Sequence, residues 1–95
     1  MLRGNKIVGP NENLQSRKAR AEDALNRAYE LLDANAQKIR RNKAKLGALP
    51  KDSPEYDDVL AALYSLEANR KNIESQIRDL EELIKELNSE IENSK

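Results

Sequence analysis

Two segments of similar length each carry an uninterrupted seven-residue repeat, and this repeat constrains the fold more than any other feature of the chain. The repeat positions are spaced alternately three and four residues apart, which is typical of the seam of a coiled coil. In the second segment every seam position except Arg70 is apolar, and the apolar positions are Tyr56, Val59, Leu63, Leu66, Ile73, Ile77, Leu80, Ile84, Leu87 and Ile91. In the first segment the apolar positions are Leu14, Ala21, Leu25, Ala28, Leu32, Ile39, Leu46 and Leu49, and the polar ones are Lys18, Asn35 and Asn42.

A short stretch rich in glycine and proline separates the two segments and predicts a tight connection between two helices. We expect Gly47 to adopt the left-handed conformation that often ends helices, and Pro50 to prevent the first helix from continuing. Ser53 followed by Pro54 is a typical helix start, because serine caps the free N–H groups and proline has no N–H to leave unpaired. The predicted organisation is an irregular N-terminal arm over residues 1–10 and a helical hairpin over 11–95, with helices at 11–47 and 53–93 and a loop at 48–52.

Because the loop is short, the two helices should lie antiparallel. Residues whose numbers add to 105 then face each other across the seam, and the midpoint of this register falls inside the loop. The central pairs are Asn35–Arg70, Leu32–Ile73, Ala28–Ile77 and Leu25–Leu80. Charge favours the same pairing: residues 1–51 hold twelve Lys or Arg and five Asp or Glu, whereas residues 52–95 hold five and twelve. The fold class is therefore all-α, an antiparallel two-helix hairpin with a coiled-coil seam.

One hairpin does not enclose a core, so we expect the hairpins to self-associate. Apolar residues beside the seam widen the apolar face beyond what one partner helix covers, and Leu31, Leu60 and Leu83 are the expected oligomer interface. A homodimer that forms a four-helix bundle is the simplest assembly that encloses a core, and a trimer with six helices is the alternative. Asn35 and Arg70 should form one polar layer of the seam, with Arg70 hydrogen-bonded to Asn35 or to a polar group of a neighbouring subunit, because such layers specify register.

The composition excludes several kinds of site. The chain has no Cys and no His, which excludes disulfides, thiolate catalysis and the usual zinc sites, and no cofactor site is predicted. Adjacent carboxylates such as Glu81 and Glu82 diverge on a helix, so we expect neither catalytic residues nor a metal site, and the chain is not expected to be an enzyme. The longest apolar run is far shorter than a membrane span, and no secretory signal is apparent, so we expect a cytoplasmic protein without membrane contact.

Five basic residues near the end of the first helix could contact phosphate groups: Lys38, Arg40, Arg41, Lys43 and Lys45. No aromatic residue lies nearby in the sequence to stack on bases, so nucleic-acid binding is the weaker interpretation of this basic patch.

Residues 53–92 resemble computationally designed (de novo) helical-hairpin bundles. The resemblance rests on the helix restart at Ser53–Tyr56, the regular Ile/Leu heptads from Ile73 to Ile91, and asparagine-rich polar layers among Leu and Ile. It implies a structural protein that self-assembles, has buried hydrogen-bond networks and has no natural ligand. The alternative is a small natural adaptor or regulator, similar in architecture to the plasmid RNA-binding protein made of two helical hairpins, which would bind RNA or a partner helix through its bundle surface.

Overall fold

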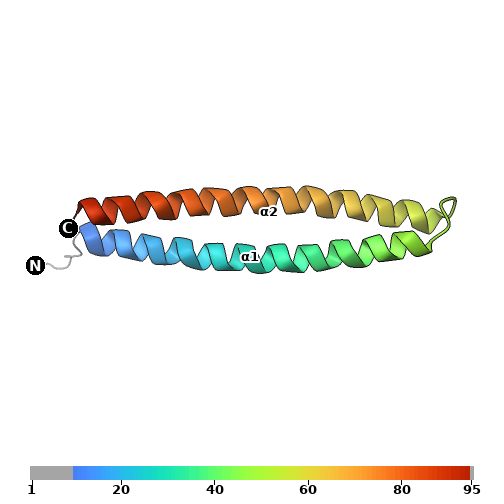
Figure 1. The fold of residues 1–95 in the computed structure, drawn as a ribbon, viewed down its shortest axis with the longest axis horizontal. Helices are drawn as coiled ribbons and strands as arrows, with labels where there is room; N and C mark the ends of the chain where they lie inside the picture. The colour runs from blue at the N-terminus through green and yellow to red at the C-terminus, as the bar shows by residue number, and fades with distance from the viewer. Residues whose placement is uncertain (1–9, 95) are drawn as a thin grey trace, which may run out of the picture.

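The computed structural model describes residues 10–94, and describes side chains from residue 13 onward. It contains two long helices, α1 (Pro10–Ala48) and α2 (Pro54–Asn93). They lie side by side and antiparallel, with the start of α1 beside the end of α2 and the loop at the opposite end (Figure 1). The predicted all-α hairpin is confirmed. Residues 1–9 of the expected arm (1–10) lie outside the described residues, and Pro10, the last residue of that arm, is the first residue of α1.

The start of α2 is built as the sequence predicts. Ser53 has an extended backbone, with φ −83° and ψ 145°, and its hydroxyl accepts a hydrogen bond from the Tyr56 N–H at 3.2 Å. Pro54 opens the helix, and Glu55 and Asp57 place negative charge in the first turn, where the helix dipole is positive. The same Ser53 hydroxyl donates to the Pro50 carbonyl at 2.8 Å, so one side chain fixes both the loop and the helix start.

The end of α1 differs from the prediction. Gly47 lies inside the helix, which continues to Ala48, and no described residue has a positive φ. The Leu49 N–H instead bonds the Leu46 carbonyl at 3.2 Å, three residues back, which tightens the last turn. This bond gives the Leu46 carbonyl a hydrogen-bond partner, which is what a left-handed glycine does for the last carbonyls of many helices. Pro50 then ends the helix. The expectation of a left-handed Gly47 was therefore wrong.

The core is a single row of side chains between the helices. Ala28, Ile73 and Ile77 are buried together, with Leu25, Leu32 and Leu80 packed against them. These six residues are three of the pairs predicted by the register, so the register is confirmed in the middle of the seam. The remaining buried apolar side chains continue the row along the helices: Ala21, Ile39, Val59, Leu63, Leu87 and Ile91.

Candidate functional site

The seam divides the surface of the hairpin into two sides. On one side the Tyr29 hydroxyl donates to a carboxylate oxygen of Glu81 at 2.8 Å across the two helices. On the other side Arg17 of α1 and Leu83 of α2 line a common hollow of about 470 Å³. Leu31 lies on this second side, because it is two heptads from Arg17 and positions seven residues apart share a direction. We call the two surfaces the Tyr29 side and the Leu31 side.

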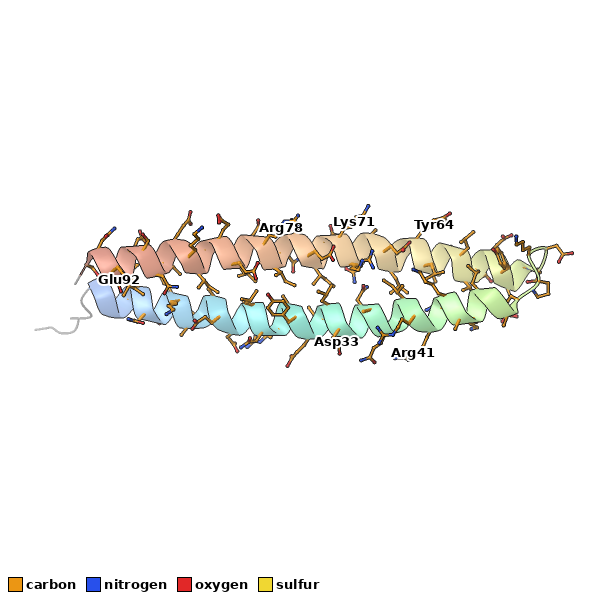
Figure 2. The ribbon with its side chains drawn as sticks, in the orientation of Figure 1. Asp33, Arg41, Tyr64, Lys71, Arg78 and Glu92 are labelled. Carbon is orange, nitrogen blue, oxygen red and sulfur yellow. The ribbon has the colours of Figure 1, made fainter. Side chains whose placement is uncertain are left out.

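In heptad terms the seam residues are positions a and d of both helices. The Tyr29 side consists of positions e and b, and the Leu31 side consists of positions g and c. On α2 the outer edge of the Tyr29 side carries Tyr64, Lys71 and Arg78, which are seven residues apart and point away from α1 (Figure 2).

The hydrogen bond between Tyr29 and Glu81 perturbs a titratable group. The carboxylate accepts the phenolic proton and so favours the neutral phenol, which raises the pKa of Tyr29 above its ordinary value; partial desolvation and the negative charge of Glu81 act in the same direction. Sequence reasoning missed this contact. Both residues occupy position e, and e positions face each other in antiparallel helices, so the heptad pattern contained the signal.

The three leucines predicted as the oligomer interface do not share one side of the hairpin. Leu31 and Leu83 both lie on the Leu31 side, where Leu31 is 57% exposed and Leu83 is half-buried. Leu60 is also half-buried, but it is three heptads from Glu81 and therefore lies on the Tyr29 side. A second hairpin that packs on one side would cover Leu31 and Leu83 but would leave Leu60 uncovered.

Asn35 and Arg70 both lie in the seam, as predicted for a polar layer, but they do not form a hydrogen bond with each other. Asn35 is 4% exposed, and its amide Nδ2 donates to the Leu66 carbonyl of α2 at 3.1 Å. The Oδ1 atom of Asn35 and the Nε atom of Arg70 are both buried without a hydrogen-bond partner in the described chain. The hairpin thus provides one buried acceptor and one buried donor, and a bond to a neighbouring subunit stays a prediction. Asn42, at the next polar seam position, bonds its own helix through the Lys38 carbonyl at 2.8 Å.

The five basic residues of the predicted patch are all exposed. Lys38, Arg41 and Lys45 occupy positions g and c and lie on the Leu31 side. Arg40 and Lys43 occupy positions b and e and lie on the Tyr29 side. The helix therefore divides the basic run into two groups that face different directions.

Among the described residues, no group of three or more Asp, Glu, His or Cys side chains is placed to hold a metal ion. Neither α1 nor α2 combines the length and the apolar character that a membrane-crossing helix needs. Comparisons of the chain with protein-family models, with curated proteins and with solved structures found no match.

Proposed function

We propose that this protein is a structural, non-catalytic helical hairpin that associates with further copies of itself. The observation that carries the proposal is the shape of the isolated hairpin, which measures 72 × 26 × 14 Å. Its shortest dimension is little more than the diameter of one α-helix with its side chains, roughly 10–12 Å. In a layer one helix thick, no further helix within residues 10–94 covers either side of the core.

The burial of the core agrees with this description. Among the described residues, Leu87 is the largest side chain that is less than 2% exposed, and Leu25, Leu32 and Leu80 are only half-buried although they belong to the central seam. The radius of gyration is 21.3 Å, whereas a compact domain of this length has about 12 Å. A second hairpin packed on one side would remove more of this apolar surface from water, which is the usual driving force for association.

The proposal gives the chain no catalytic role. The charged residues that line the hollow of about 470 Å³, Arg17, Glu86 and Glu90, are all exposed to solvent. Catalytic groups depend on partial burial and on close charged neighbours to tune their pKa values. The resemblance to designed helical-hairpin bundles supports the same function, because such proteins are made to assemble.

Light scattering in line with size-exclusion chromatography tests the proposal. We expect a molar mass of twice the 10.8 kDa of the chain, or three times that mass for a six-helix assembly. The measurement should cover protein concentrations from low to high micromolar. A mass of 10.8 kDa throughout this range would contradict the proposal.

The competing function is that of an adaptor that binds RNA through the basic residues of α1. The exposure of all five residues favours it, but their division between two sides gives no continuous basic surface. Binding of a structured RNA in a gel-shift assay, lost between about 50 and 200 mM salt, would support the adaptor instead.

A further inference from the structure

The two helices carry charges of opposite sign on the Leu31 side. On α1, positions g and c contain six cations and no acidic residue in the part of the chain whose side chains are described. These cations are Arg17, Arg20, Arg27, Lys38, Arg41 and Lys45, and all of them are exposed. On α2, the same positions contain exposed acidic residues and no cation over residues 54–94. The acidic residues are Glu55, Asp58, Asp79, Glu86 and Glu90.

The Tyr29 side of α2 is arranged differently. There, Glu74 precedes Arg78 by four residues and Glu81 precedes Lys85 by four residues, so acidic and basic side chains are neighbours on the same helix. Such pairs balance charge within one helix and are typical of a face in contact with solvent.

On the Leu31 side, positions g and c of each helix carry charges of one sign only. Arg27 has an acidic partner beside this surface, Asp23 at position f, whose carboxylate oxygen it contacts at 2.6 Å. A surface with one sign of charge along each helix suits contact with opposite charge on another molecule.

We infer that a second copy of this chain packs on the Leu31 side with its loop at the same end, so that the cationic α1 of each copy lies against the acidic α2 of the other. The inference rests on the proposed self-association and adds its surface and its orientation. Each helix then has antiparallel neighbours of opposite charge, around a symmetry axis parallel to the helices. A three-fold axis in this direction also places the cationic α1 of each copy beside the acidic α2 of a neighbouring copy.

The register of the hairpin brings these charges to matching heights. Positions that add to 105 lie at the same height along the hairpin, so Arg20 lies level with position 85 and Arg27 lies level with position 78. In a copy with its loop at the same end, Glu86 and Asp79 are each one residue from those heights, which is about 1.5 Å along a helix. The opposite charges therefore face each other without any sliding of one hairpin past the other.

Packing with the loops at opposite ends gives the reverse result. That arrangement places α1 beside α1 and α2 beside α2, because the two-fold axis is then perpendicular to the helices. With Leu31 at the axis, Arg17 meets the region of Lys45, and Arg20 meets the region of Arg41. Like charges in contact oppose association, so the charge pattern selects the arrangement with the loops together.

Apolar side chains on the Leu31 side are placed to contribute to the same contact. Leu83 lies between two hollows of about 470 and 280 Å³, which it lines together with Arg17. In the arrangement with the loops together, the hollows of the two copies lie at the same height along the helices. The small Ala24 of one copy then lies within two residues of the height of Leu83 of the other copy. Leu31, which is 57% exposed in the isolated hairpin, becomes covered.

A distance measurement between spin labels tests the orientation. The chain contains no cysteine, so Lys51→Cys in the exposed loop provides one labelling site per copy. Loops at the same end should give a distance below about 30 Å, because neighbouring helix axes in a bundle are roughly 8–10 Å apart. Loops at opposite ends should give a distance approaching the 72 Å length of the hairpin.

The possible results separate the orientation from the proposed function. A short distance in a dimer or trimer supports both. A long distance in an assembly of the correct mass overturns the orientation but leaves self-association intact. The absence of any dipolar coupling, together with a monomeric mass, overturns self-association itself and therefore also this inference.

Charge reversal tests the contact surface. The variant Arg20→Glu/Arg27→Glu and the variant Asp79→Lys/Glu86→Lys should each weaken self-association by at least about tenfold at low salt, and an equimolar mixture should recover it, since opposite charges then face each other again. The matched control, Arg40→Glu/Lys43→Glu, makes the same change of charge on the Tyr29 side of α1. If the control weakens association equally, or if the mixture does not recover it, the inference is wrong.

Discussion

Replacement of the polar seam residues by leucine should make the hairpin as stable as the native chain or more stable. Asn35→Leu removes the hydrogen bond from Nδ2 to the Leu66 carbonyl, which contributes about 0.5–1.5 kcal/mol. The Leu66 carbonyl lies within α2 and keeps its helical partner, so no acceptor is left unpaired on that helix. The same change removes the buried, unpaired Oδ1, whose desolvation costs about 1–3 kcal/mol. The expected net effect on the free energy of unfolding is therefore between about −0.5 and +2.5 kcal/mol.

Arg70→Leu and the double variant follow the same reasoning, because the Nε atom of Arg70 is also buried without a partner. The assay is urea unfolding followed by circular dichroism at several protein concentrations, which separates stability of the hairpin from association. Asn42→Leu is the matched control, since its amide is already satisfied within its own helix. A loss of more than about 2 kcal/mol for Asn35→Leu alone would contradict this expectation. It would mean that Arg70 depends on Asn35 and becomes an unpaired buried charge without it. We also expect the double variant to populate more than one oligomer, since an apolar seam penalises shifted registers less.

Three other predictions concern single contacts. Ile77→Ala should lower the free energy of unfolding by about 2–5 kcal/mol in urea melts, because Ile77 is 7% exposed and lies in the central cluster; an effect below 1 kcal/mol would contradict that position. Ser53→Ala should cost about 0.5–2 kcal/mol through loss of the helix cap, whereas Ser53→Asp should largely restore stability. Tyr29 should ionise above the ordinary tyrosine pKa of about 10, so its contribution to stability is complete below that pH and is lost as the pH rises through the raised pKa. Ultraviolet titration of a variant with the other two tyrosines replaced by Phe should show this, and Glu81→Gln should lower the pKa again.

The seam, the loop and the antiparallel register could be predicted from the sequence because each depends on local rules. Heptad spacing fixes which residues face the partner helix, and Ser53 and Pro54 define the helix start without reference to the rest of the chain. The end of α1 was less predictable, because Gly47 can adopt either helical or left-handed geometry at similar cost. The bond from Leu49 to the Leu46 carbonyl, which the sequence does not reveal, decided between them.

The candidate site was predicted only in part, because a residue list does not state which residues share a direction. Leu31, Leu60 and Leu83 are all leucines next to the seam in the heptad repeat. In the structure, however, Leu60 lies on the Tyr29 side, whereas Leu31 and Leu83 lie on the Leu31 side.

Asn35 and Arg70 were expected to share one layer because their heights match, with Arg70 bonded to Asn35 or to a polar group of a neighbouring subunit. Within one hairpin the two residues do not bond to each other, because side-chain length and direction also decide whether two seam residues meet. Asn35 reaches the backbone of α2 one turn before Arg70 instead.

Sedimentation equilibrium of Leu31→Gln, compared with Leu60→Gln and the native chain, tests self-association through the Leu31 side. Both substitutions replace a leucine beside the seam by a neutral polar residue. They alter opposite sides of the hairpin, and Leu60 is the more buried of the two leucines. We expect Leu31→Gln to weaken association while the helical content stays unchanged, and Leu60→Gln to associate like the native chain. Equal association of Leu31→Gln and the native chain, or a greater loss for Leu60→Gln, would contradict self-association through the Leu31 side.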